Sequence, residues 1–212
     1  MKENEIIMAD GSIEPKKLRV RLTFFRPILG SGNANPHLHE EFIASKSQSK
    51  EKTEEEVEAI NVDETISKEM TVFARTEDGR PCLWDYQIKG FFKHACKMMA
   101  KVPNSESSKL KAYLKMIDGE VFISERKIPF ENVKEITSLQ RPLRASTLQG
   151  ERIALANSEM IPEGASVEFT IEYLVPSLEK CIKEWLRYGH YVGLGQWRNS
   201  RAGSFNWEEV TA

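Results

Sequence analysis

The sequence predicts an α+β fold in which two helices pack against one face of an antiparallel sheet. Two strands with period-2 alternation support this prediction, near residues 18–24 and 167–173. Each is followed further along the chain by a helix with one apolar face, the first beginning at Asp85 and the second covering 178–186. A strand with this alternation buries one of its two faces, and the apolar faces of the helices cover the buried face of the sheet.

In the first half of the chain, the strand formed by Leu18, Val20, Leu22 and Phe24 ends before Pro27. A hairpin is expected around Asp78-Gly79, because glycine adopts the positive φ that a tight turn needs. We expect Asp85 to cap the first helix. Its apolar residues recur at helical spacing and are Ile88, Phe91, Phe92, Ala95, Met98 and Met99.

The second half contains the remaining elements of the sheet. A short helix is expected over 107–116, a strand over 120–124 and an extended hairpin over about 139–158, where no helical stripe is present. A final strand covers roughly 203–210. Without the insertions the order is strand, helix, strand, strand, helix, strand, which is that of the ferredoxin-like or RRM-type fold.

The 212 residues are expected to form a single domain, 1–212, with an acidic insertion at 37–69 that contains 10 acids and 4 bases. Within it, Thr53 and Glu56 form a capping box, and the run SKSQSKEKT is expected to be mobile. Residues 70–156 instead hold 15 bases and 10 acids. This middle region could face an anion. The alternative, equally well supported, is that the acidic insertion and the basic region are both ordinary solvated surfaces.

Several functional classes are excluded. No apolar run is long enough to cross a membrane and no signal peptide is recognisable, so we expect a cytoplasmic protein. Three widely spaced cysteines, Cys82, Cys96 and Cys181, predict buried free thiols and neither a disulfide framework nor a zinc knuckle. The GLGQ segment follows a helix and precedes a strand, which excludes a dinucleotide fingerprint, and no cofactor is expected.

Histidines occur at two places where they could take part in metal binding or catalysis. The cluster His37, His39, Glu40 and Glu41 lacks a second ligand pair at a usual spacing, so a polar loop is favoured over a metal site and no metal is expected. His190 is the better candidate for acid–base work on a ribose hydroxyl, but the sequence names no partner that would orient it.

The segment between the second helix and the last strand combines close-approach glycines, a stacking ring and phosphate donors, which suits RNA. The residues concerned are Gly193, Gly195, Gln196, Trp197, Arg198 and Arg201. A tight structural connection is the alternative. Lys89, Lys93 and Lys97 follow one another at i, i+4 and i+8 on the first helix, and such a stripe is often only a solvated face.

Four segments in order resemble the RAMP superfamily, the RRM-fold backbone and processing subunits of CRISPR effector complexes. They are RLTFFRPILGSGNANP, LWDYQIKGFFKHA, SEMIPEGASVEFTIEYL and YVGLGQWRNSRAGSF, which together span most of residues 18–207. The block TVFARTEDGRPCLWDYQIKGFFK also resembles uncharacterised bacteriophage proteins, which suggests a stand-alone relative encoded outside a CRISPR locus.

The resemblance implies a groove for single-stranded RNA between the helix that begins at Asp85 and the Gly193 segment. Lys89 and Lys93 would contact phosphates there, and the hairpin with Arg141 and Arg144 would reach toward the strand or a neighbouring subunit. Relatives that cut target RNA carry an Asp before Asn-Pro, where this chain has Ala34, so no catalytic residue is expected.

The expected function is therefore binding of single-stranded nucleic acid, most simply RNA, without cleavage. Protein partners or self-assembly into a filament or ring are also expected from the resemblance. A protein-interaction factor, such as a phage-encoded mimic or inhibitor of a RAMP-type complex, is the alternative that the acidic insertion supports. An endoribonuclease that depends on His190 is the third hypothesis.

Overall fold

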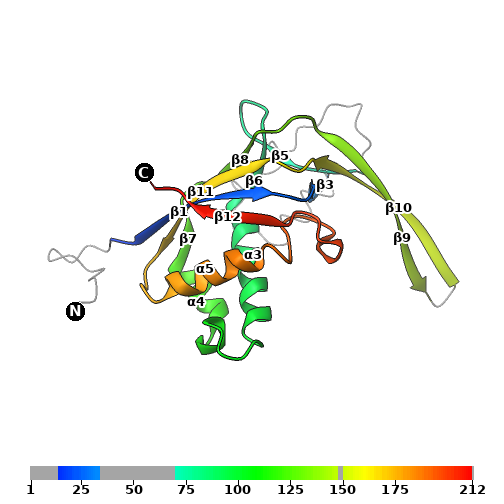
Figure 1. Ribbon diagram of the computed structural model, residues 1–212. Helices are drawn as coiled ribbons and strands as arrows, with labels where there is room; N and C mark the ends of the chain where they lie inside the picture. Colours follow the sequence, from blue (N-terminus) through cyan, green and yellow to red (C-terminus); the bar gives the residue numbers. More distant parts are fainter. Residues whose placement is uncertain (1–13, 34–69, 148–149, 212) are drawn as a thin grey trace, which may run out of the picture.

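The computed structural model describes residues 14–33, 70–147 and 150–211 (Figure 1). Side chains of residues 143–155 are not described. The acidic insertion at 37–69, the Thr53 capping box, the His37 cluster and Ala34 all lie outside the described residues.

The main sheet confirms the predicted α+β class and its strand order. It runs β12-β1-β11-β8-β6-β5, with β7 also paired to β11, and every pairing in it is antiparallel. The strands are β1 (Lys16–Phe24), β5 (Ala74–Arg75), β6 (Pro81–Trp84), β7 (Val121–Ile123), β8 (Lys127–Glu131), β11 (Ser166–Tyr173) and β12 (Phe205–Glu209). Taking β7 and β8 together as the second strand, the spatial order is fourth, first, third, second. This is the ferredoxin-like, RRM-type arrangement.

Two long helices, α3 (Asp85–Met99) and α5 (Leu178–Tyr188), cover one face of this sheet (Figure 1). The alternating residues of β1 are buried beneath them, as the period-2 pattern predicts. The Phe92 and Trp185 rings join the two helices with centroids 5.5 Å apart. The structure confirms the prediction of buried free thiols at Cys82, Cys96 and Cys181.

Two local predictions about helices were wrong. The N-cap of α3 is Trp84, whose backbone N–H donates to Gln87 Oε1 at 2.8 Å, while the Asp85 carboxylate pairs with Arg126. The helix expected over 107–116 is divided into a 3-10 turn, η1 (Ser107–Lys109), and a helix, α4 (Tyr113–Glu120).

A contact from α5 holds the start of η1, and the break before α4 lies at Ala112. The Glu184 carboxylate of α5 accepts the backbone N–H groups of Glu106 at 2.9 Å and Ser107 at 3.0 Å. Ala112, with φ of 51°, then turns the chain before α4 begins. Backbone donors that a continuous helix would leave unpaired at its start are satisfied by a carboxylate distant in sequence.

A second, smaller sheet contains the predicted hairpin. Its strands are β2 (Ile28–Leu29), β3 (Gly32–Asn33), β4 (Met70–Val72), β9 (Thr137–Thr147) and β10 (Gly150–Ile161). The hairpin β9–β10 extends away from the main sheet (Figure 1), and its observed bounds, 137–161, are somewhat wider than the expected 139–158. The other hairpin is also confirmed, with Gly79 at φ of 79° in the turn between β5 and β6.

The base of the β9–β10 hairpin is anchored to the rest of the molecule by Glu159, which is 5% exposed. Its carboxylate accepts the Phe73 backbone N–H at 2.8 Å and pairs with Arg75 Nη2 at 2.5 Å. The Gly30 backbone N–H donates to the Glu159 carbonyl at 2.9 Å. Three separate chain segments therefore meet at this hairpin base, which fixes the position of nearby residues.

Candidate nucleic-acid interface

The open face of the main sheet, opposite the helices, carries paired charges. Arg21 bridges Glu168 at 2.5 Å and Glu208 at 3.1 Å, and Lys17 pairs with Glu172 at 3.0 Å. The strands β1, β11 and β12 direct their aromatic side chains toward the helices and the core. Because RRM domains stack bases on aromatic rings of this face, the central strands here do not offer that mode of binding.

The segment between α5 and β12 packs on the chain that follows β1, and its glycines make this possible. A Cβ on Gly195, which has φ of +81°, would lie 2.6 Å from the Leu29 carbonyl oxygen. A Cβ on Gly193 would lie 2.1 Å from the Gly203 carbonyl carbon. These two predicted site residues therefore face protein backbone, and they position the segment rather than presenting a surface to a ligand.

Trp197 projects from this segment in an unusual backbone conformation. It has φ of 58°, and its side chain is 45% exposed. The Trp197 carbonyl accepts hydrogen bonds from the Ser200 backbone N–H at 3.0 Å and from Ser200 Oγ at 2.8 Å. Bulky residues rarely adopt positive φ, and such strained positions concentrate at binding sites. The backbone here holds a large ring at the surface.

Arg141, from β9, lies directly beside this ring. Its Cζ is 5.1 Å from the centroid of the Trp197 ring, and its Nη2 donates to Gln196 Oε1 at 3.0 Å. Its Nη1 is 3.4 Å from Ser158 Oγ, which itself accepts a hydrogen bond from Thr71 Oγ1 at 2.7 Å. Thus the predicted residues Arg141, Gln196 and Trp197, which are distant in sequence, form one cluster.

The charge of Arg141 is unbalanced. The residue is only 7% exposed, and no carboxylate in the described ranges pairs with it. Its Nε is buried without a hydrogen-bond partner, and so is Asn157 Oδ1 on the neighbouring strand β10. Burial lowers the pKa of Arg141, but a guanidinium keeps its proton in proteins. A buried cation of this kind favours an anionic ligand, because most buried charges have a partner.

The two predicted lysines of α3 lie elsewhere. Lys89 Nζ donates to the Asp118 carbonyl at 3.2 Å, and Lys93 Nζ pairs with Asp118 Oδ1 at 2.5 Å, so both face α4. Desolvation is the main cause that lowers the pKa of Lys89. The structure does not bring Lys89 and Lys93 together with the Arg141–Trp197 cluster.

The α3 residue that does approach the C-terminal segment is His94, which the sequence reasoning missed. Its ring centroid lies 6.4 Å from that of Tyr188. Burial is the largest cause that lowers its pKa, and the positive charges of Arg198 and Lys97 lower it further. Each four-residue step on a helix rotates by about 40°. The lysine stripe therefore drifts around α3, and Lys97 lies nearer the flank of His94 than Lys89 does.

Three predicted arginines remain. Arg198 begins a 3-10 turn, η2 (Arg198–Ser200), directly after Trp197. Arg201 Nη2 donates to the His190 carbonyl at 3.0 Å, and its buried Nε has no partner among the described residues. Arg144 lies opposite Ile153 in the hairpin, and its side chain is not among those described.

His190 has the orienting neighbours that the sequence could not name. Its Nδ1 lies 2.9 Å from Asn206 Oδ1, and its ring lies 4.8 Å from the Phe25 ring, centroid to centroid. An amide oxygen only accepts hydrogen bonds, so this contact places the proton on Nδ1 and leaves Nε2 to face other groups. The ring is held in place, but this contact alone does not establish a reaction.

The described residues contain neither a metal-ligand cluster nor a membrane-spanning helix. Within residues 14–33, 70–147 and 150–211, no group of three or more His, Cys, Asp or Glu side chains is arranged to hold a metal ion. Among the same residues, no helix combines the length and the apolar character that a membrane crossing requires.

Comparison with known proteins identifies no family for this chain. No protein-family model and no curated protein matches the chain. Among solved structures, it is similar to one chain of the cryo-EM structure of the Type III-B Cmr-beta bound to cognate target RNA. That match has a TM-score of 0.48 and 12% sequence identity, and it covers 92% of this chain and 60% of that one. The chain thus spans less than two thirds of that protein's length.

Proposed function

We propose that this chain binds single-stranded RNA without cutting it, as a RAMP-like, CRISPR-related module. The binding surface consists of Arg141, Gln196 and Trp197, and Arg198 and Arg201 flank it. The observation that carries this proposal is the buried guanidinium of Arg141, which pairs with no carboxylate among the described residues and lies beside an exposed tryptophan ring.

The chemistry of the cluster fits a phosphate joined to a base. A phosphate supplies the negative charge that the buried guanidinium lacks, and Arg binds phosphate through several parallel hydrogen bonds. The Trp197 ring offers a surface on which a base can stack, and such stacking tolerates any sequence. Contacts of this kind position a strand rather than read its sequence.

A single strand fits this surface better than a duplex. The Trp197 ring can stack only on a base whose face is accessible, and bases in a duplex are covered by their neighbours. The open face of the sheet, with its paired charges, adds no second platform over β1, β11 and β12. The RAMP resemblance of the sequence agrees with this proposal, and it adds protein partners as an accompanying expectation.

The test is fluorescence anisotropy with a labelled RNA of about 16 nucleotides, the upper end of single-fold site sizes. Wild-type protein should bind at low salt, and the affinity should fall as salt rises, because bound phosphates release counterions. Trp197→Ala should weaken binding by ~1 to 3 kcal/mol, the contribution of one stacked base. The matched control is Phe122→Ala, which removes another exposed ring, 39% accessible, on the α4 side of the molecule.

Two results would contradict the proposal. One is undetectable binding of RNA at low salt; capture of a defined protein partner would then favour the interaction factor. The other is an equal effect of Trp197→Ala and Phe122→Ala on RNA affinity. Comparison with a DNA strand of the same sequence shows whether the 2′-hydroxyl contributes.

A further inference from the structure

The exposed residues of α3 fall on two flanks with different surroundings. Lys89 and Lys93 belong to the flank that faces α4, where Asp118 contacts both of them. His94 belongs to the opposite flank, where it contacts Tyr188 of α5 and interacts electrostatically with Arg198 and Lys97. Lys101 lies just beyond the end of α3, in a turn where its backbone N–H donates to the Met98 carbonyl at 3.2 Å.

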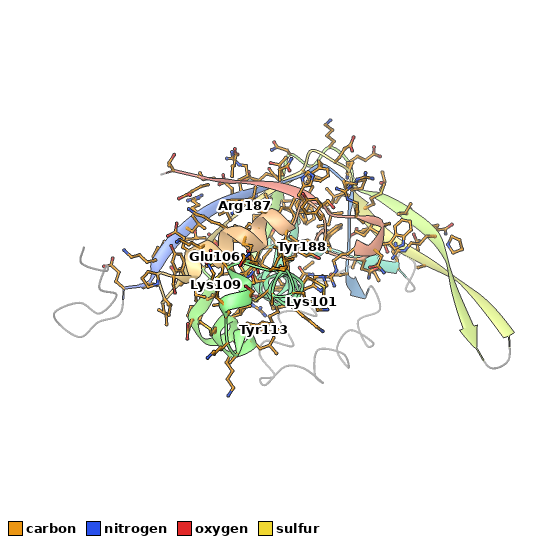
Figure 2. The ribbon with its side chains drawn as sticks, turned by 60° about the horizontal axis from the view of Figure 1, so that its bottom comes forward. Lys101, Glu106, Lys109, Tyr113, Arg187 and Tyr188 are labelled. Atoms are coloured by element: carbon orange, nitrogen blue, oxygen red, sulfur yellow. The ribbon has the colours of Figure 1, made fainter. Side chains whose placement is uncertain are left out.

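The His94 flank is positively charged and largely unpaired. Lys97, Lys101 and Arg187 are exposed, and no carboxylate of the described ranges forms an ion pair with any of them. Figure 2 shows Lys101, Lys109 and Arg187 on the face where α3, η1 and α5 meet, with Tyr113 and Tyr188 on the same face.

The acidic groups nearby are already engaged. Glu106 pairs with Lys109 at 2.9 Å, and Glu184 accepts the backbone N–H groups that begin η1. Neither carboxylate pairs with Lys97 or Lys101. The flank therefore carries an excess of positive charge that adjoins Arg198 and, through it, the segment that holds Trp197.

We infer that the His94 flank of α3 is a second part of the RNA-binding surface, along which the phosphate backbone continues from Trp197 past Arg198 to Lys97 and Lys101. This inference rests on the proposed function and specifies the path of the strand. The flank extends for about 7.5 Å from His94 to the end of α3 at Met99, at 1.5 Å per residue, and continues into the turn that holds Lys101, so it contacts more than one phosphate. Lysine provides a point charge without a fixed geometry, which suits a backbone of any sequence.

The path differs from the one that the lysine stripe predicts. Phosphate contacts at Lys89 and Lys93 would place the RNA strand on the α4 side of α3, whereas the contacts of His94 place it on the α5 side. The Lys89–Lys93 pair thus provides an internal control, because each flank offers two lysines four residues apart.

The experiment compares Lys97→Gln/Lys101→Gln with the matched control Lys89→Gln/Lys93→Gln. Each protein is titrated with RNAs of about 4 and about 16 nucleotides over a range of salt, with thermal melting to verify folding. For the longer RNA, Lys97→Gln/Lys101→Gln should reduce the slope of log affinity against log salt by about 1.4, that is ~0.7 for each lost phosphate contact. The slope for the control should stay at the wild-type value, and the short RNA, held at Trp197, should bind all three proteins alike.

Each alternative outcome has a distinct meaning. If the wild-type protein binds neither RNA, the proposed function fails and this inference fails with it. If both RNAs bind but the two double variants have the same slope, the proposed function stands and the inference is overturned. A loss confined to Lys89→Gln/Lys93→Gln also overturns it, and restores the path that the sequence predicts.

Discussion

The guanidinium of Arg141 lies over the indole ring of Trp197, with its Cζ 5.1 Å from the ring centroid, although 55 residues separate Arg141 from Gln196, which it also contacts. This contact joins the base of the β9–β10 hairpin to the segment before β12. The hairpin and the segment thus form one surface, on which a buried positive charge and an exposed ring lie together. The predictions below test what this contact and its surroundings do.

Replacing Arg141 by methionine should separate a binding role from a structural one. Removing a buried charge that has no carboxylate partner costs the folded protein little, because desolvating that charge is itself unfavourable. We expect an unchanged or higher melting temperature for Arg141→Met. RNA affinity should fall about tenfold or more, since a hydrogen bond to a charged group contributes ~1.5 to 3 kcal/mol.

The control for this variant is Arg80→Met, which removes an exposed arginine from the β5–β6 turn, where its partner is Asp78. It should leave RNA affinity at the wild-type value. A large drop in melting temperature for Arg141→Met, with RNA affinity retained, would show that Arg141 is a structural residue.

Glu159→Ala should destabilise the protein by ~3 kcal/mol, because it leaves Arg75 without its partner and the Phe73 backbone N–H without its acceptor. The hairpin base should loosen, and RNA affinity should fall along with stability because Arg141 belongs to the same hairpin. Chemical denaturation followed by circular dichroism measures the change. Glu163→Ala, an exposed residue two positions after β10, should leave stability within experimental error of wild type.

His94 should make the stability of the free protein depend on pH. Burial and the nearby Arg198 and Lys97 lower its pKa from the ordinary value of 6.5, so folding favours the neutral form of this ring. As pH falls through 6.5, the unfolded chain binds a proton that the folded chain does not, and stability decreases until pH passes below the folded pKa. The difference in melting temperature between pH 7.5 and pH 5 should be smaller in His94→Gln.

RNA binding should reverse the effect on His94. A phosphate beside Arg198 and Lys97 offsets their charges, so the pKa of His94 rises in the complex and binding takes up a proton. Wild-type affinity should therefore increase as pH falls from 7.5 to 5.5, by more than it does in His94→Gln. Identical pH profiles for the two proteins would place the phosphates away from this flank.

The protein should leave RNA intact in the presence of divalent metal ions. This expectation comes from the resemblance of the sequence to the RAMP superfamily, which places Ala34 where members that cut RNA carry Asp. The measurement is gel electrophoresis of a labelled RNA after prolonged incubation with purified protein. Specific cleavage that disappears in His190→Ala, while Asn206→Ala reduces it, would instead support the ribonuclease hypothesis, since Asn206 contacts the His190 ring.

The sequence by itself determined the fold class and most of the elements. Alternation in 18–24 and 167–173 identifies strands with one buried face, and the apolar stripe of the helix from Asp85 identifies a helix that lies on them. These signals are local, because the period of the hydrophobic pattern follows from backbone geometry alone. The order of the elements then leaves few ways to assemble them.

The same local reasoning failed where a distant group decides the outcome. The helix expected over 107–116 is interrupted at Ala112, which has φ of 51°, and the start of the 3-10 turn before it is held by Glu184, far along the chain. Asp85 is the first residue of α3 rather than its N-cap, and its carboxylate pairs with Arg126 as well as accepting the Tyr86 backbone N–H at 2.8 Å. Neither partner can be inferred from the residues nearby.

Only the tertiary structure decided which candidate residues meet. Residue types that suit RNA were visible in Arg141, Gln196 and Trp197, but their contact arises because the hairpin base and the C-terminal segment pack on the same short strand, β2, and its surroundings. The flank of α3 that carries His94 is likewise set by how the helix packs between α4 and α5. A stripe of lysines fixes spacing along a helix, whereas the packing of its apolar face fixes where each lysine points.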